Sequence, residues 1–141
     1  MVAPTPYLTL PGTARAALET YARVFGGRTE VHTYADFGRT DGPAGLVAHG
    51  ALVDGPVALF AADAADLDPS TTPTPGTLVL ALLGTAPAAT LHRWFDGLAD
   101  GGTVVDALRR RPWGASDGRV DDRFGVAWLV GYEGEGPADA G

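Results

Sequence analysis

The 141-residue chain contains no cysteine, lysine, asparagine, glutamine or isoleucine. Without cysteine it can form no disulfide, thiolate nucleophile, zinc ribbon or cysteine-ligated iron–sulfur cluster. Without lysine it has neither a Schiff-base amine nor a P-loop lysine, and all ten basic residues are arginines. Because Ala, Gly, Arg and Pro are abundant at the same time, these absences indicate the coding bias of a GC-rich genome.

Long apolar runs and an excess of basic charge are also missing. No run reaches the roughly 18 apolar residues of a membrane helix, and residues 1–4 do not begin a secretory signal. We therefore expect a cytoplasmic protein with no membrane partner. The net charge of −7 argues against a nucleic-acid partner, which would need a basic stripe. The basic cluster at residues 109–111 is typical of a solvated or protected sheet edge.

The chain length fits one domain, or two tightly packed half-domains, but not two independent cores. Apolar residues make up 45% of the sequence and charged residues 19%, as in globular proteins. Residues 63–76 are rich in Asp, Pro, Thr and Ser, which predicts a linker, and residues 132–141 are expected to form a flexible tail. We expect a single domain over residues 1–141.

The periodic segments on either side of this linker repeat in the same order. Residues 14–25 and 86–99 are predicted helices, because apolar residues recur at three- and four-residue spacing and a glycine pair follows. Thr13 is expected to cap the first helix. The apolar stripe Leu18, Tyr21, Ala22 and Phe25 returns 73 residues later as Leu91, Trp94, Phe95 and Leu98. The predicted strands are residues 7–10, 28–36, 46–53, 57–62, 77–83, 103–108 and 124–131, with a turn-rich stretch before the last.

The sequence therefore predicts an α+β fold of two βαβββ modules, residues 5–62 and 77–131. Each module would form a curved, mostly antiparallel mixed sheet with its helix on one face. The strand at residues 77–83 is apolar on both sides, so its second face should be buried as well. Two curved sheets that share this burial would enclose a groove.

Two stretches resemble the PhnB-like branch of the vicinal oxygen chelate superfamily, which includes glyoxalase, bleomycin-resistance and extradiol dioxygenase proteins. Residues 6–8, 17–21 and 24–27 are similar to the N-terminal signature of that branch. Residues 113–128 match its W-G-x(3)-G-x-V-x-D-x-F-G-V-x-W stretch at every position, and His49 stands where the branch has a histidine in its third strand. The resemblance covers about residues 5–131. It implies a homodimer whose grooves are built from both chains.

The resemblance also implies where a metal ion would bind. Metal-dependent members hold the cation with His, Glu or Gln on the first and last strand of each half. The matching positions here are Pro6, Phe60, Leu78 and Leu129, and a slip of one residue finds no His, Asp or Glu. A proline and three apolar side chains cannot replace the hydration shell of a cation, so we expect no metal and no other cofactor.

No catalytic residue can be assigned. Ser70 and Ser116 lie in predicted loops outside a G-x-S-x-G context. Asp121 and Asp122 are adjacent, so their side chains should point to opposite faces of a strand, and Asp122 is expected to cap the turn that follows it.

Histidines offer one site candidate. His32 is expected on the polar face of a strand and His92 on a helix surface. His49 lies in an apolar strand, where it could be a core residue bonded to a backbone carbonyl or Asp122, a donor to a ligand, or a metal ligand.

Aromatic residues complete the predicted site. The candidate ligand-binding residues are Tyr7, Tyr34, Phe37, His49, Phe60, Trp113 and Trp128. Trp128 also fits a core position, and Trp113 lies in a loop beside Gly114. An aromatic crevice with few polar groups suits a flat hydrophobic ligand.

These features favour a non-catalytic protein that binds a hydrophobic or aromatic small molecule without a metal ion. Sequestration of this kind is known as a mode of antibiotic resistance in the family that the sequence resembles, and the acidic charge favours a neutral or cationic compound. The alternatives are a metal-dependent lyase or isomerase of the glyoxalase type, and an interaction module whose groove is filled by its own side chains.

Overall fold

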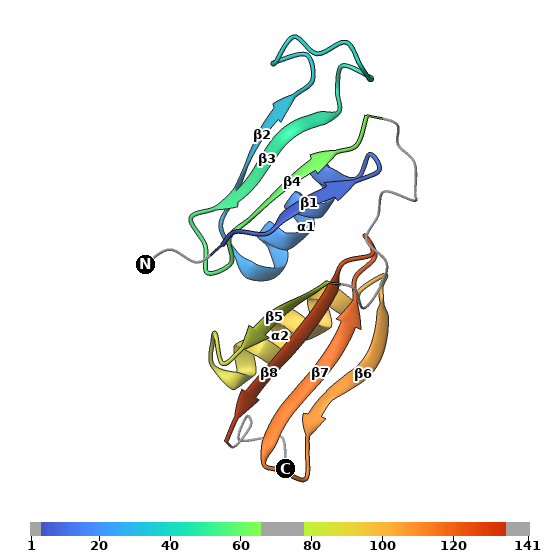
Figure 1. The fold of residues 1–141 in the computed structure, drawn as a ribbon. Coiled ribbons are helices and arrows are strands. Elements are labelled where there is room, and N and C mark those ends of the chain that lie inside the picture. The colour runs from blue at the N-terminus through green and yellow to red at the C-terminus, as the bar shows by residue number, and fades with distance from the viewer. Residues whose placement is uncertain (1–3, 66–77, 135–141) are drawn as a thin grey trace. The chain divides into compact units, whose positions relative to one another are not determined.

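A computed structural model describes residues 4–65 and 78–134 (Figure 1). The chain divides into two compact units, residues 1–72 and 73–141. Most of the predicted linker, most of the predicted tail and Ser70 lie outside the described residues.

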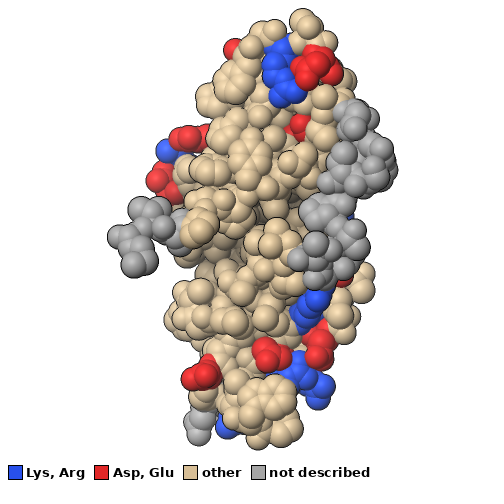
Figure 2. All heavy atoms as spheres, in the orientation of Figure 1, with Lys and Arg blue, Asp and Glu red and all other residues tan. Residues whose placement is uncertain are grey.

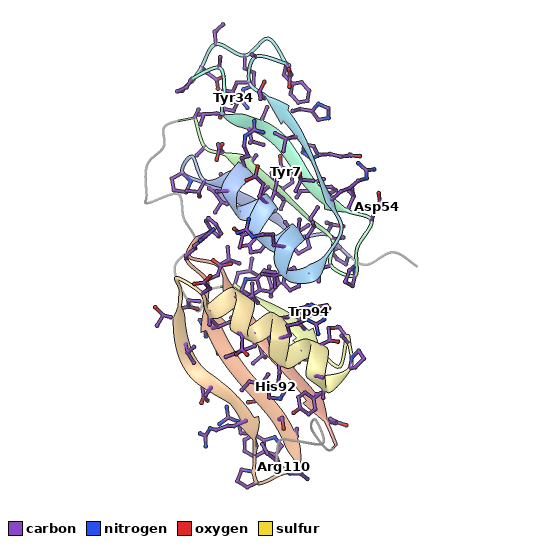
Figure 3. All side chains as sticks on the ribbon, turned by 180° about the vertical axis from the view of Figure 1, so that it is seen from behind. Tyr7, Tyr34, Asp54, His92, Trp94 and Arg110 are labelled. Carbon is purple, nitrogen blue, oxygen red and sulfur yellow. The ribbon has the colours of Figure 1, made fainter. Side chains whose placement is uncertain are left out.

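The first unit is a four-stranded sheet with one helix. Its elements are β1 (Tyr7–Leu10), α1 (Ala14–Phe25), β2 (Arg28–Thr33), β3 (Val47–Val53) and β4 (Leu59–Asp63). The strand order is β1-β4-β3-β2, with β1 parallel to β4 and the other neighbours antiparallel. Seen from behind in Figure 3, α1 covers one face of this sheet.

The predicted bounds of α1 are confirmed, because its apolar stripe is the buried face of the helix. Leu18, Tyr21 and Phe25 are all buried. The contact with the sheet is close: a Cβ atom added to Gly50 would lie 2.5 Å from Leu18 Cδ1, so a side chain there would displace Leu18. The expected cap at Thr13 is wrong, since its side chain makes no capping hydrogen bond.

Asp63 caps α1 instead. The backbone N–H of Ala14, in the first turn of the helix, donates to Asp63 Oδ1 at 2.9 Å, and the N–H of Val47 donates to Oδ2 at 2.9 Å. The Asp63 carboxylate therefore joins α1, β3 and β4 inside the unit. Because Asp63 belongs to β4, the predicted linker began too early.

The second unit repeats the arrangement of the first. Its elements are β5 (Val79–Leu83), α2 (Ala88–Ala99), β6 (Thr103–Arg110), β7 (Ala115–Asp121) and β8 (Ala127–Glu133). The strand order β5-β8-β7-β6 mirrors that of the first sheet, with β5 parallel to β8. The predicted α+β class and the two similar βαβββ modules are confirmed.

Several elements of the second unit differ from the prediction. Helix α2 begins at Ala88 rather than at residue 86, and a strand, β7, lies where a turn-rich stretch was expected. The sequence did not indicate this strand because its inward positions include Ser116 and Gly118 rather than only large apolar residues. The last strand continues to Glu133, so the residues expected to begin the tail are part of the sheet.

Asp122 organises the core of the second unit. Its Oδ1 accepts hydrogen bonds from the backbone N–H groups of Phe124 and Val126 at 2.9 and 3.0 Å, which confirms the expected turn cap. Its Oδ2 accepts a hydrogen bond from Trp128 Nε1 at 2.9 Å. This buried carboxylate thereby holds a turn and the largest core side chain together.

Several surface charges form ion pairs. On the face shown in Figure 2, some basic and acidic groups stand next to one another. Examples are Arg28 with Glu30 at 2.8 Å and Arg39 with Asp41 at 2.6 Å. The side-chain bond to Asp41 raises the pKa of Arg39. Exposed pairs of this kind contribute little stability.

Candidate functional site

One face of the first sheet is not covered by α1. Since the Cα–Cβ direction of Gly50 points towards Leu18 of the helix, its neighbours His49 and Ala51 point to the opposite face. Phe60 pairs with Ala51 and Tyr7 pairs with Phe60, so they share that face. His32 pairs with His49 on β2 and lies on it as well.

Tyr7, His49 and Phe60 form a compact group, which we call the His49 cluster. The Tyr7 hydroxyl lies 3.3 Å from His49 Nδ1. The ring centroid of His49 is 5.1 Å from that of Phe60 and 5.7 Å from that of Tyr7, both in tilted arrangements. Tyr7 and Phe60 are themselves 6.0 Å apart. These separations fall within the range of favourable aromatic contacts.

The hydrogen bond defines what the imidazole can offer a ligand. A neutral imidazole that accepts the Tyr7 hydrogen at Nδ1 carries its own hydrogen at Nε2. His49 and Phe60 are partly exposed, and Tyr7 is 52% exposed. The His49 cluster therefore combines three partly open rings with a second ring nitrogen, Nε2, which is a donor in that tautomer.

A second pair of rings lies beside β2. The His32 ring stacks on Phe37, with centroids 5.5 Å apart and an interplanar angle of 15°. Phe37 is held by a turn in which the Thr33 N–H donates to Asp36 Oδ2 at 2.8 Å. This backbone bond is the main reason that the pKa of Asp36 lies below its ordinary value. The stack adds an exposed aromatic surface at the β2 edge of the sheet.

The structure brings together only some of the predicted site residues. Tyr7, His49 and Phe60 form one group, and Phe37 lies at the end of neighbouring β2. Trp113, in the turn between β6 and β7 of the second unit, is 71% exposed.

Tyr34 and Trp128 lie in the cores of their units. Tyr34 is fully buried, its hydroxyl donates to the Asp63 carbonyl at 2.7 Å, and the Arg39 guanidinium lies 3.7 Å from its ring centroid. Trp128 is 1% exposed and bonded to Asp122. Because both side chains are buried, neither belongs to the His49 cluster.

Sequence reasoning missed two polar groups of the second unit. Arg111, expected in a solvated cluster, is 9% exposed at its side chain and bonds to Asp106 at 2.7 Å and Asp117 at 2.8 Å. Hydrogen bonds to both carboxylates raise its pKa. His92, expected on a helix surface, is half-buried with its Nε2 atom 2.8 Å from the Tyr132 hydroxyl. The pairing of β6 with β7 brings the partners of Arg111 together, and the packing of α2 on β8 brings His92 to Tyr132. Neither arrangement is visible in the local sequence.

The positions that hold a metal ion in other members do not fit a cation here. Phe60 is part of the His49 cluster, and Leu129 pairs with Ala81 and Arg119 on the second sheet. Within residues 4–65 and 78–134, no group of three or more His, Cys, Asp or Glu side chains could hold a metal ion. No helix in these ranges is long and apolar enough to cross a membrane.

Known proteins share the sequence pattern and the fold. Protein PA1353 from Pseudomonas aeruginosa is 32% identical, with a TM-score of 0.75 over 96% of this chain and 100% of that chain. A PhnB protein from Bacillus cereus is 20% identical, with a TM-score of 0.75 over 95% and 100% of the two chains, which shows the fold alone.

A shorter match links the chain to YjdN from Escherichia coli, which is 42% identical over 38 residues, or 27% of this chain. The matched segment spans 26% of the length of this curated relative. The model of the Glyoxalase/Bleomycin resistance protein/Dioxygenase superfamily matches residues 9–130. The chain therefore belongs to the Glyoxalase/Bleomycin resistance protein/Dioxygenase superfamily, as its sequence motifs predicted.

Proposed function

We propose that the protein binds a flat hydrophobic or aromatic small molecule at the His49 cluster and sequesters it without a metal ion. The observation that carries this proposal is the position of the His49 imidazole. It contacts two aromatic rings on a partly exposed sheet face, and one of its two ring nitrogens, Nε2, is not used in the contact with Tyr7. Membership of the superfamily does not decide between binding and catalysis, because one fold hosts many functions.

The chemistry of the cluster supports a neutral aromatic ligand with one acceptor atom. Tyr7 and Phe60 offer ring faces and edges for offset or edge-to-face packing. In the tautomer that accepts the Tyr7 hydrogen, the Nε2–H of His49 would donate to a hydroxyl or carbonyl oxygen and so orient the ligand. Phe37, stacked on His32, would extend the aromatic surface, and sequestration of this kind would suit a role in antibiotic resistance.

The alternative, a metal-dependent lyase or isomerase of the glyoxalase type, is less well supported. It requires several His, Glu or Gln ligands, whereas the implied positions hold Pro6, Phe60, Leu78 and Leu129. A binding protein retains its affinity in the presence of a chelator, and a metal-dependent enzyme loses its activity there.

We further infer that the protein works as a homodimer. Large apolar side chains are exposed on both units, including Tyr7, Leu83, Val104 and Val105. Their burial against a second copy would remove this apolar surface from water. Sedimentation velocity at micromolar concentration should give the mass of a dimer, and a monomer would contradict this inference.

The binding proposal can be tested with 2-naphthol, a flat neutral compound with one hydroxyl group. We expect saturable binding in EDTA-containing buffer. His49→Ala and Phe60→Ala should each weaken it by about 1–3 kcal/mol, the range for a contact in a binding hot spot. Asp96→Ala, at an exposed position on α2 outside the His49 cluster, is the control and should change nothing. Equal affinity in all three variants would refute the assigned site.

A further inference from the structure

Ring-bearing side chains cross the whole uncovered face of the first sheet. Figure 1 shows the strands of this sheet side by side in the order β1, β4, β3 and β2. Each strand places one ring on this face, and the turn after β2 adds a fifth; the members are Tyr7, Phe60, His49, His32 and Phe37. We call this set the aromatic row. The His49 cluster forms one half of it.

The row runs diagonally over the sheet because of the residues beside it. Straight across the strands, Phe60 pairs with Ala51, and Ala51 pairs with Glu30. Glu30 accepts a hydrogen bond from an arginine of the same strand at 2.8 Å, so the surface is charged at that point. Two residues along β3 from Ala51, His49 pairs with His32. The ring surface therefore continues from Phe60 through His49 to His32.

The outer half of the row is held in place by the turn after β2. The Phe37 N–H donates to the Thr33 carbonyl at 3.3 Å, and the Thr33 N–H donates to Asp36 Oδ2 at 2.8 Å. The rings of His32 and Phe37 are nearly parallel, with an interplanar angle of 15°. Both side chains are exposed, Phe37 by 56%. Rings that are ordered before a ligand arrives lose little entropy on binding, so this pair suits ligand contact.

The spacing of the strands sets the length of ligand that fits the row. Neighbouring strands lie about 4.8 Å apart, so β4 with Phe60 and β2 with His32 are separated by about 10 Å. His49 lies on β3, between them. The rings of β1 and β4 offer aromatic surface at one end, and those of β2 and its turn offer it at the other. A compound with a single ring system covers only one end of the row.

The corresponding position of the second sheet is charged. Gly50 and Gly118 are each the fourth residue of their strands, β3 and β7. The residue before Gly50 is His49, whereas the residue before Gly118 is Asp117, which bonds to Arg111 at 2.8 Å. We therefore expect one ligand per chain, bound to the first unit.

We propose that the ligand of the aromatic row is an elongated neutral compound in which an acceptor group joins two aromatic ring systems. This inference rests on the proposed function and names its ligand class. One ring system would pack against Tyr7 and Phe60. The acceptor would take a hydrogen bond from His49 Nε2, in the tautomer that accepts the Tyr7 hydrogen. The second ring system would pack against His32 and Phe37, which makes His32 a specificity-determining residue.

The compound trans-chalcone, two phenyl rings joined by an enone, has this pattern, and benzalacetone is the same compound with a methyl group in place of one ring. Because the chain contains no cysteine or lysine, the usual nucleophiles that add to an enone are absent. In equilibrium dialysis we expect one chalcone to bind per chain, at least about tenfold more tightly than benzalacetone. The NMR signals of His32 and His49 should shift along one saturation curve as chalcone is added.

Variants at the outer end of the row separate this contact from general hydrophobicity. Phe37→Ala and His32→Ala should each lower the chalcone affinity about five- to tenfold and change the benzalacetone affinity by less than about twofold. His32→Phe keeps a flat ring and should retain most of the chalcone affinity. Asp96→Ala, on α2, is the control and should change neither. All the replaced side chains are exposed, so the variants should fold normally.

Two results would overturn this inference while 2-naphthol still binds at the His49 cluster. The first is equal affinity for chalcone and benzalacetone. The second is a tighter chalcone complex whose affinity Phe37→Ala and His32→Ala leave unchanged, because the gain would then come from hydrophobicity alone. A failure of the proposed function differs from both: neither 2-naphthol nor chalcone would then shift the His49 signal, and both proposals would fall.

Discussion

Replacement of Asp63 by alanine should destabilise the first unit strongly. Its two carboxylate oxygens accept the N–H groups of Ala14 and Val47, each at 2.9 Å, and the side chain is buried. Hydrogen bonds to a charged group contribute about 1.5–3 kcal/mol each. The carboxylate also lies at the N-terminus of α1, where negative charge is favourable.

These contributions predict that Asp63→Ala lowers the free energy of unfolding by about 3–5 kcal/mol. Asp63→Asn keeps one acceptor oxygen but points its amide hydrogens at the second N–H group, so it should lose roughly half as much. Since a typical domain has a stability of about 5–15 kcal/mol, either change should be easy to detect.

Urea unfolding followed by far-UV circular dichroism measures this loss. Asp96→Ala is the control, because Asp96 is exposed on α2, and it should change the stability by less than about 0.5 kcal/mol. In hydrogen exchange, the Ala14 and Val47 amides should lose protection in Asp63→Ala. A loss below about 1 kcal/mol with both amides still protected would show that Asp63 does not hold these elements together.

Two further predictions concern the tryptophans and Asp36. Trp128→Ala should cost about 3–5 kcal/mol of stability, because it leaves a cavity in the core and removes the indole partner of Asp122. Trp113→Ala should leave the thermal melt nearly unchanged, since Trp113 is largely exposed, and a large loss of stability would place Trp113 in a core. The Asp36 carboxyl should titrate below the ordinary aspartate range in an NMR experiment, because its lowered pKa reflects the Thr33 N–H bond. The stability from this bond is present above the unfolded-state pKa and is lost as the pH falls through the lowered folded-state pKa; an ordinary titration would contradict the turn geometry.

The helices could be predicted from sequence because their information is local. Three- and four-residue spacing of Leu18, Tyr21 and Phe25 defines one face, and the glycines after Phe25 end the helix. β7 was missed because its inward positions include Ser116 and Gly118, which hide the period-two pattern of a strand.

The role of Asp63 could not be predicted, because it depends on contacts between distant parts of the chain. Asp63 and Ala14 are 49 positions apart, and the carboxylate looks like the start of an acidic linker. No local pattern shows that a strand brings it to the N-terminus of a helix.

The sequence could predict which residue types belong to the candidate site, but not which of their side chains lie close together. Strand alternation separates the face of His49 from that of Gly50. The Tyr7–His49 contact also requires the parallel pairing of β1 with β4 and its register. Residue type alone could not distinguish the buried rings of Tyr34 and Trp128 from the exposed ones.

The most direct test of the proposed function follows the three histidines of the chain by NMR during a 2-naphthol titration. We expect the imidazole signal of His49 to shift saturably and the signal of His92 to stay in place. The dissociation constant should be the same in EDTA and in zinc-supplemented buffer. A static His49 signal at saturation, or binding that appears only with zinc, would contradict metal-independent binding at the His49 cluster.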